Sequence, residues 1–198
     1  MIAKRVFDLF FSVVGLLFLS PVFLLIAIWV KTDSAGPVFF RQVRVGRFGK
    51  PFRIFKFRSM CVEGEATGKQ ITVGDDVRIT CAGRFLRRYK LDELPQLLNV
   101  VRGEMSLVGP RPEVPRYVAF YPAGLREKVL SVPPGITDYT SIEYVDENAI
   151  LANAIDPETV YVERVIPLKL RNYERYVSER SIGKDLKIIL ATLKAIAR

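Results

Sequence analysis

Hydrophobic residues along the chain form one long run near the N-terminus and several shorter, periodic stretches after it. Residues 9–30 contain no charged side chain. As a straight helix this run would be about 33 Å long, which is enough to cross a hydrocarbon core of about 30 Å. It exceeds the roughly 7–15 apolar residues of a signal peptide, and no Ala-x-Ala cleavage pattern follows it. The pattern therefore predicts a membrane helix.

Ser20 and Pro21 interrupt this run near its middle. Proline removes one helix hydrogen bond and clashes with the carbonyl four residues back, so we expect a kink or a break. The serine hydroxyl can bind a carbonyl that the proline frees, which makes the irregularity tolerable in lipid. Two topologies stay open at this point: a kinked helix that crosses the membrane, and a re-entrant helix-break-helix that enters and leaves through one leaflet.

Basic residues lie on both sides of the apolar run. Lys4 and Arg5 precede it, and eight more lysines and arginines follow between Lys31 and Arg58. Positive charge marks the cytoplasmic flank of a membrane helix, and a single crossing cannot place both flanks there. The charge pattern therefore speaks for the re-entrant topology without deciding it.

Shorter patterns predict the remaining elements. Residues 37–60 alternate around a turn that contains Gly46, Gly49 and Pro51, as expected for a β-hairpin. Residues 62–80 are polar and read as a loop. Helical spacing predicts further helices at residues 82–90, 95–101, 116–131, 157–180 and 183–197.

These elements predict a mostly helical α+β protein with one compact domain. Residues 1–36 would form the membrane-anchoring helix and residues 37–198 a domain at the cytoplasmic face. In the last helix, an apolar stripe lies opposite several lysines and suits either core packing or an interfacial membrane helix. Core packing is the interpretation we favour for this stripe, which consists of Leu186, Ile189, Leu190, Leu193 and Ile196.

The composition narrows the chemistry. A net charge of +9 implies an anionic partner, namely nucleic acid, an acidic membrane face or a phosphorylated substrate. The absence of histidine excludes Ser-His and Cys-His nucleophile pairs and every His-ligated metal site. Cys61 and Cys81 are too far apart for a zinc knuckle or a redox pair, and we expect buried or partly buried thiols in a reducing compartment.

The strongest candidate site is the pair Asp92-Glu93, which precedes the short helix expected to begin at Pro95. A helix N-terminus attracts phosphate, and a carboxylate can attack phosphorus to give an acyl phosphate once the phosphate charge is neutralised. A Mg²⁺ ion held by the second acid would contribute to that neutralisation. The alternative is that Asp92 caps the helix and Glu93 interacts with its dipole, with no chemistry. Candidate phosphate-binding cations are Lys56, Arg58, Arg87 and Arg111.

The segment Gly109-Pro110-Arg111-Pro112 is the second candidate. Two prolines restrict the backbone around Arg111 and present its guanidinium at low entropic cost. The alternative is a rigid turn whose arginine makes a structural salt bridge.

These motifs together resemble the bacterial sugar transferase family, the catalytic core of the monotopic phosphoglycosyl transferases. The resemblance covers residues 1–137 well and the rest more loosely. In chain order it rests on Lys4-Arg5-Val6-Phe7-Asp8, Ser20-Pro21, Gln42-Val43-Arg44-Val45-Gly46, Gly49, Lys56-Phe57-Arg58-Ser59-Met60, Leu86-Arg87, Leu91-Asp92-Glu93-Leu94-Pro95-Gln96, Asn99-Val100, Met105 to Pro112 and Pro134-Gly135-Ile136-Thr137.

The resemblance implies transfer of a sugar-1-phosphate from a UDP-sugar to undecaprenyl or another polyprenyl phosphate, at the cytoplasmic face of the bacterial inner membrane. This step begins the assembly of a glycoconjugate. On the family pattern Asp92 attacks the sugar-linked phosphate, UMP leaves, and the lipid phosphate then attacks the phosphosugar-aspartate. Glu93 would hold Mg²⁺, and Lys56, Arg58, Arg87 and Arg111 would bind phosphates. Ser20-Pro21 matches the break that makes the family's membrane helix re-entrant.

The chain departs from the family after Thr137. Members usually continue with Gly-Leu-Ala-Gln-Val-Asn-Gly-Arg, whereas this chain runs from Asp138 to Val145, with Val145 in place of the arginine. We expect a subgroup with different sugar recognition and a small, core-only architecture without extra N-terminal membrane helices. We expect no nucleic acid partner, and a homodimer is possible. The rival interpretations are a membrane-tethered basic protein that binds anionic lipid or nucleic acid without catalysis, and a hydrolase that passes the phosphosugar to water.

Overall fold

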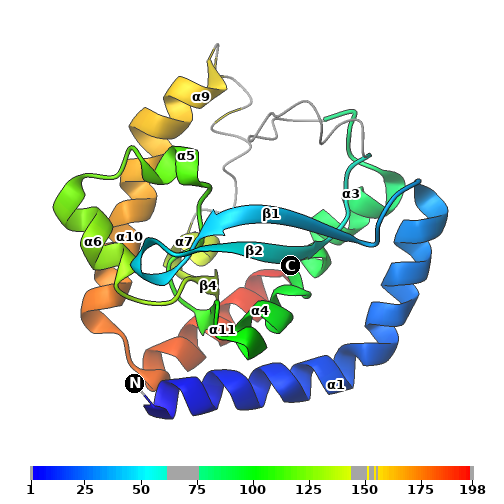
Figure 1. Ribbon diagram of the computed structural model, residues 1–198, viewed down its shortest axis with the longest axis horizontal. Coiled ribbons are helices and arrows are strands. Elements are labelled where there is room, and N and C mark those ends of the chain that lie inside the picture. Colours follow the sequence, from blue (N-terminus) through cyan, green and yellow to red (C-terminus); the bar gives the residue numbers. More distant parts are fainter. Residues whose placement is uncertain (1, 62–75, 144–150, 152–153, 155, 197–198) are drawn as a thin grey trace.

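A computed structural model describes residues 2–61, 76–143, 151, 154 and 156–196 (Figure 1). Its helices and strands are α1 (Ile2–Asp33), β1 (Phe39–Val45), β2 (Pro51–Phe57), α3 (Cys81–Arg88), α4 (Gln96–Arg102), β3 (Ser106–Val108), α5 (Pro115–Val118), α6 (Ala123–Leu130), β4 (Gly135–Thr137), α7 (Tyr139–Glu143), α9 (Pro157–Val160), α10 (Ile166–Glu179) and α11 (Ile182–Ile196). Short 3₁₀ turns lie at η1 (Arg47–Gly49) and η2 (Leu91–Glu93), and a π-helical turn, η3, spans Tyr161–Val165. The predicted mostly helical α+β class is confirmed.

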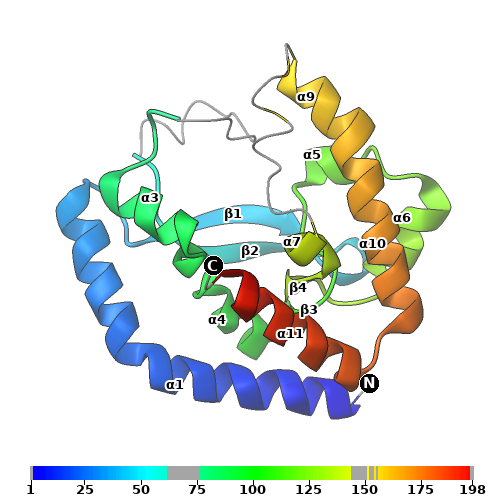
Figure 2. The ribbon, with the colours of Figure 1, turned by 180° about the vertical axis from the view of Figure 1, so that it is seen from behind.

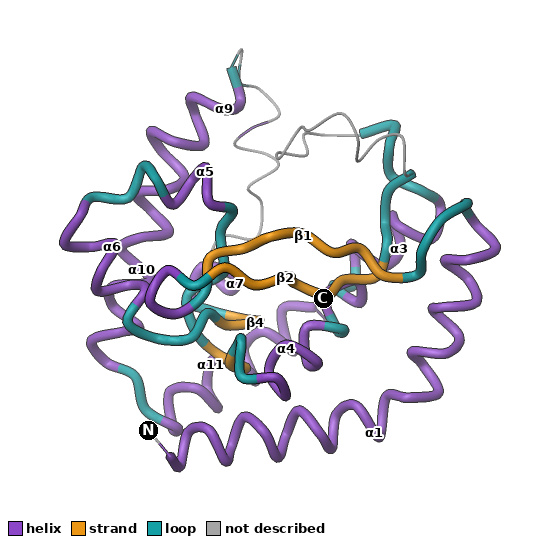
Figure 3. The backbone as a smooth tube through the Cα atoms, viewed as in Figure 1, coloured by secondary structure: helices purple, strands orange, loops and turns teal. Residues whose placement is uncertain are grey.

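The strands form two small sheets inside a frame of helices (Figure 3). β1 and β2 pair antiparallel, with Val45 opposite Pro51 at the turn, so the predicted hairpin is confirmed. β3 and β4 pair in parallel. In Figures 1 and 2, α1 follows one edge of the molecule and then turns to follow a second edge, while α6 and α10 lie on the opposite side of the hairpin.

α1 is one continuous helix with a bend rather than two helices separated by a break (Figure 1). Pro21 lies inside it and leaves the Leu17 carbonyl, four residues earlier, without its usual amide donor. The Ser20 hydroxyl donates to that carbonyl at 2.8 Å. The expected role of Ser20 is therefore confirmed, and of the expected kink or break the structure shows a kink, because the helix bends without being interrupted.

The outer surface of α1 is apolar. The helix is long and apolar enough to cross a membrane by length and composition, and only 11% of its most apolar 18-residue window is buried. Phe18 and Leu17 are 82% and 71% exposed. A core helix of a soluble domain would bury such side chains, so this surface requires an apolar environment of its own. The re-entrant path stays a prediction, as does the domain boundary between residues 36 and 37.

The first turns of α1 are joined to the domain by charged side chains. Lys4 pairs with Asp8 at 2.8 Å and with Asp185 of α11 at 2.9 Å. Asp8 is buried and also accepts a hydrogen bond from the Ser106 hydroxyl at 2.9 Å. Arg5 donates to the carbonyl of Val100 near the end of α4. The first turns of α1 and the domain therefore share one polar network.

Two regions differ from the sequence-based expectation because of prolines. The single helix expected at 116–131 is interrupted, since Pro122 disfavours a helical conformation at the residue before it and α6 begins only after it. The helix expected at 157–180 contains the π-helical turn η3 immediately before α10. Pro167, in the first turn of α10, has no amide to donate to the carbonyl of Glu163, which accounts for the wider turn there.

The last helix buries a different face from the one we favoured. Asp185 and Ile188 of α11 are buried, whereas Leu186, Leu190 and Leu193 are 42%, 65% and 59% exposed. Core packing is therefore the wrong interpretation for most of this apolar stripe.

The prediction of buried or partly buried thiols is also wrong, because Cys61 and Cys81 are both free and exposed.

Candidate active site

Asp92 and Glu93 lie in η2, the tight turn that joins α3 to α4. Lys90 adopts a left-handed backbone conformation with φ of 55° and starts this turn. Both carboxylates are buried, at 6% and 8% exposure. No side chain caps η2 or α4, and the N-cap residue of α4 is Pro95. The alternative that Asp92 merely caps the helix is therefore wrong.

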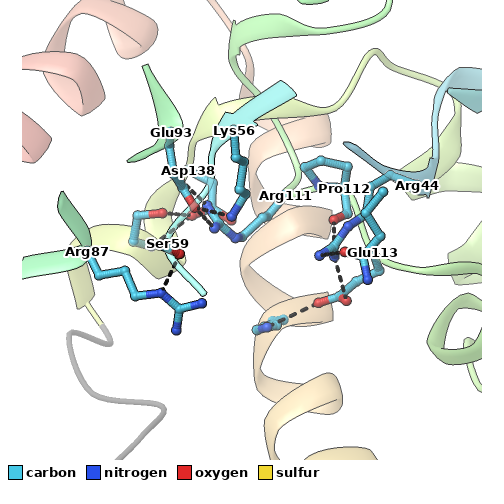
Figure 4. Close-up of polar contacts among 12 residues, drawn as sticks. Arg44, Lys56, Ser59, Arg87, Glu93, Arg111, Pro112, Glu113 and Asp138 are labelled. Carbon is cyan, nitrogen blue, oxygen red and sulfur yellow. Dashed lines mark hydrogen bonds and ion pairs between the residues drawn. The ribbon is translucent and has the colours of Figure 1, made fainter. Parts of the chain in front are cut away.

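The Glu93 carboxylate lies between two cations (Figure 4). Lys56 Nζ of β2 donates to Oε1 at 2.8 Å, and Arg111 donates to both oxygens, with Nη1 at 3.0 Å from Oε2. Burial raises the pKa of Glu93, but the charges and hydrogen bonds of Arg111 and Lys56 outweigh it and hold the pKa well below its ordinary value. Glu93 is therefore ionised and doubly paired.

Asp92 has a different environment. Within the described part of the chain, no group donates a hydrogen bond to its carboxylate. Burial and the neighbouring Glu93 charge raise its pKa, against the opposing charges of Lys56 and Arg87. Two adjacent acids whose pKa values are shifted in opposite directions are typical of groups with different chemical roles. Asp92 keeps free lone pairs beside two cations, which is the arrangement that an attacking carboxylate needs.

Arg87 reaches the site from α3. Gly83 allows this, because a Cβ at that position would lie 2.0 Å from the carbonyl oxygen of Ser59. The close approach brings Arg87 Nε to 2.9 Å from the Ser59 hydroxyl at the end of β2 (Figure 4). The sequence analysis did not identify Ser59 as a site residue, although the motif Lys56 to Met60 contains it.

Arg111 is positioned by the second sheet. Gly109 donates to the carbonyl of Thr137 at 3.0 Å, and Gly135 donates to the carbonyl of Pro110 at 2.9 Å. A Cβ on Gly135 would lie 2.0 Å from the Gly109 nitrogen, so only glycine permits these two segments to approach. The strand pairing thus fixes the backbone immediately before Arg111.

The structure brings Asp92, Glu93, Lys56, Arg87 and Arg111 together, but it places Arg58 elsewhere. The Arg58 side chain is 1% exposed and donates to the carbonyls of Val30 and Ser34 at 3.0 and 2.6 Å. A guanidinium there satisfies carbonyls at the end of α1 that have no helical partner. The expectation that Arg58 binds phosphate is therefore corrected to a structural role at the C-terminus of α1.

The donor set for a metal ion is small. Among the described residues, no group of three or more aspartate, glutamate or cysteine side chains lies close enough to hold a cation. The site offers Glu93 and its neighbour Asp92. Two acids match the one or two carboxylates that Mg²⁺ usually binds, although both Glu93 oxygens already accept hydrogen bonds from Lys56 and Arg111.

Comparison with known proteins matches the entire chain, residues 1–198, to the model for bacterial sugar transferases. The chain belongs to the bacterial sugar transferase family. Over 98% of its length it is 40% identical to an undecaprenyl-phosphate glucose phosphotransferase of Komagataeibacter xylinus. It is 42% identical, again over 98% of its length, to a UDP-glucose:undecaprenyl-phosphate glucose-1-phosphate transferase of Klebsiella pneumoniae.

The chain spans 36% and 40% of the length of these two relatives. A third relative is of similar size: the uncharacterized sugar transferase EpsL of Bacillus subtilis strain 168 is 38% identical over 99% of this chain and 88% of its own length. The alignment with the two larger relatives therefore covers one region of each, whereas the alignment with EpsL covers most of its length.

Proposed function

We propose that the protein is a phosphoglycosyl transferase that moves a sugar-1-phosphate from a UDP-sugar to undecaprenyl or another polyprenyl phosphate and releases UMP. One observation carries the proposal: the buried Asp92 carboxylate accepts no hydrogen bond from a described residue, while its neighbour Glu93 is paired with Lys56 and Arg111. Two larger relatives named for this kind of transfer support it.

In the first half-reaction an oxygen of Asp92 attacks the phosphorus that carries the sugar. A bond forms between that oxygen and phosphorus, and the bond from phosphorus to the oxygen bridging to UMP breaks, so UMP leaves with that oxygen and the electron pair. The nucleophile is already an anion. No proton has to be removed, which agrees with a chain that contains no histidine.

In the second half-reaction a phosphate oxygen of the lipid attacks the same phosphorus. The bond between phosphorus and Asp92 breaks, the carboxylate is regenerated, and the product is a lipid-linked sugar diphosphate. Both nucleophiles are oxyanions, so the protein contributes mainly charge neutralisation and alignment.

Lys56, Arg87 and Arg111 supply the neutralisation. Lys56 and Arg111 are held on Glu93 and retain side-chain exposures of 18% and 32%, so they can contact an entering phosphate. Arginine suits this task because its planar fork binds two phosphate oxygens at once. When Mg²⁺ is bound, Glu93 would hold it, and the ion would neutralise charge on the diphosphate.

We also propose that α1 enters and leaves the bilayer through the cytoplasmic leaflet. The bend at Pro21, the apolar outer face and the basic residues on both flanks support this path. When both ends of the protein carry tags, both tags should be protected in intact spheroplasts and accessible once the membrane is permeabilised. Pro21→Ala should favour a straight crossing and move one tag to the other side; a wild-type protein with tags on opposite sides would contradict the proposal.

The decisive experiment is isotope exchange without lipid. Purified protein is incubated with Mg²⁺, a panel of UDP-sugars and radiolabelled UMP. A covalent intermediate predicts that label returns to the UDP-sugar in the absence of acceptor, and that Asp92→Asn abolishes this exchange. Asp156→Asn, at an exposed helix cap of α9, is the control and should exchange like the wild type.

Product analysis with polyprenyl phosphate separates the rival functions. A lipid-linked sugar diphosphate supports transfer, whereas free sugar phosphate would indicate a hydrolase. Binding of anionic lipid or nucleic acid that depends steeply on salt, together with no turnover of any UDP-sugar, would support the non-catalytic alternative and overturn the proposal.

Addition of EDTA should stop the exchange and Mg²⁺ should restore it. Full activity in the presence of chelator would contradict the proposal that Glu93 holds a metal ion.

A further inference from the structure

A second acid follows the Pro-Arg-Pro segment directly and plays no part in the proposed reaction. Glu113 is two residues beyond Arg111 and is 6% exposed. Its carboxylate accepts hydrogen bonds from the Tyr161 hydroxyl at 2.6 Å and from Lys169 Nζ at 3.1 Å. Lys169 is also buried, at 4% exposure. This segment is therefore attached by its side chain to α10 and to the turn that precedes α10.

The same segment is attached to β1 by its backbone. Arg44 donates to the carbonyl of Pro112 at 3.1 Å, and the Val45 amide donates to the carbonyl of Glu113 at 2.9 Å. Arg44 also lies 3.7 Å from Glu113 Oε2, whereas Lys169 donates to Oε1. Figure 4 shows Arg44 and Glu113 on one side of Pro112, with Arg111 directed away from them toward Glu93.

We infer that Glu113 is a positioning residue for the phosphate-binding Arg111, acting through its buried contacts with Lys169, Tyr161 and Arg44. The inference rests on the proposed function of Arg111. The β3–β4 pairing fixes the chain before Arg111, and Glu113 fixes it afterwards, so the two ends of a three-residue segment are held by separate elements. The Arg111 guanidinium on such a segment is held in one orientation before the phosphate binds, so little conformational entropy is lost on binding.

Charge explains why an acid is needed at this position. Without the carboxylate, Arg44 and Lys169 would lose an anion that both of them face, and the repulsion between Arg44 and Arg111 would be less compensated. Burial raises the pKa of Glu113, but Lys169, Arg44 and the hydrogen bonds hold it below its ordinary value, so the group is an anion at neutral pH. A neutral side chain at this position would release the segment on its α10 side.

The test is a double-mutant cycle against Arg111. Glu113→Gln alone removes the anion of a buried ion pair while Lys169 keeps its charge, and this can impair folding, so the cycle uses Glu113→Gln combined with Lys169→Met. This pair replacement removes both buried charges and leaves the glutamine able to accept from Tyr161. It is made in the wild-type background and in the Arg111→Ala background, and two quantities are measured: kcat/KM for the UDP-sugar and the affinity for UDP by calorimetry.

If Glu113 acts through Arg111, the pair replacement lowers kcat/KM about 10- to 100-fold in the wild-type background. In the Arg111→Ala background it lowers kcat/KM less than about twofold, because there is no guanidinium left to misplace. UDP affinity should follow the same pattern. Glu174→Gln breaks an exposed ion pair between α6 and α10 and should leave both quantities unchanged in either background.

Equal losses in both backgrounds would overturn the inference and assign the network to general stability. The measurement of UDP affinity requires no turnover, so it tests the positioning role independently of the catalytic step. Failure of the proposed function would give a different result, because the wild type itself would then release no UMP from any UDP-sugar.

Discussion

Two buried glutamates, Glu93 and Glu113, show how similar groups can serve different purposes. Each carboxylate lies among two cations, and each has its pKa held below the ordinary value by them. Around Glu113 the paired lysine is 4% exposed and a tyrosine completes the hydrogen bonds. Around Glu93 the cations are partly exposed, and the adjacent Asp92 accepts no hydrogen bond from the described residues.

The two sites differ in whether every carboxylate has hydrogen-bond partners and in how far the paired cations are exposed to solvent. An ion pair sealed from water, such as Glu113 with Lys169, fixes the backbone, because movement would separate two buried charges. A network that leaves one anion unpaired beside accessible cations can accept a phosphate without first breaking its own fold. The variants below are chosen to separate these two behaviours.

Loss of the unpaired anion should have the largest effect on activity. Asp92→Asn removes the nucleophile and should lower UMP release by at least about 10³-fold, since no other group lies ready to replace it. Because no described group donates to this carboxylate, the apparent Tm should change little. A variant that loses its fold together with its activity would show that Asp92 belongs to a saturated network after all.

Loss of one charge from the sealed network should have the largest effect on stability. Lys169→Met leaves the Glu113 carboxylate buried with fewer partners and should lower the free energy of unfolding by about 3–5 kcal/mol. Glu174→Gln breaks the exposed pair with Lys128 and should change it by at most about 1 kcal/mol. Denaturant unfolding in detergent measures both. Equal effects would mean that burial does not distinguish the two pairs.

Arg111→Lys should affect substrate binding more than folding. Lysine keeps the charge but loses the fork that binds both Glu93 oxygens and, on our proposal, two phosphate oxygens. We expect kcat/KM for the UDP-sugar to fall about 10- to 100-fold, in keeping with the loss of a charge-assisted hydrogen bond. The apparent Tm is the control measurement. Unchanged kinetics would separate Arg111 from the phosphate.

The pH dependence of activity should show the smallest and most specific effect. Asp92 must be ionised to attack, and its pKa is raised, so kcat/KM should fall with decreasing pH at a value above the ordinary pKa of aspartate. Arg87→Gln removes a positive charge near Asp92 and should move this fall to higher pH. A shift to lower pH would contradict the assignment of Asp92 as the titrating group.

Patterns within short segments allowed much of this molecule to be predicted. The apolar run over residues 9–30, the alternation around Gly46 and Gly49, and the placement of Asp92-Glu93 before Pro95 depend on neighbours a few positions away. The hydrogen bond from the Ser20 hydroxyl at the bend of α1 is also a local feature, because the Leu17 carbonyl that accepts it lies three residues back. Such features follow from local geometry and are visible in the sequence.

The partner of each charged side chain was decided only by the tertiary structure. Lys56 lies in β2 and Arg58 directly follows that strand, yet Arg58 binds carbonyls at the end of α1 and Lys56 binds Glu93. The apolar stripe of α11 was visible, but its neighbours were not, and its three leucines are exposed. Glu113 meets Lys169 across 56 residues of chain. Hydropathy and spacing describe one segment at a time, whereas a buried charge is satisfied by whichever segment packs against it.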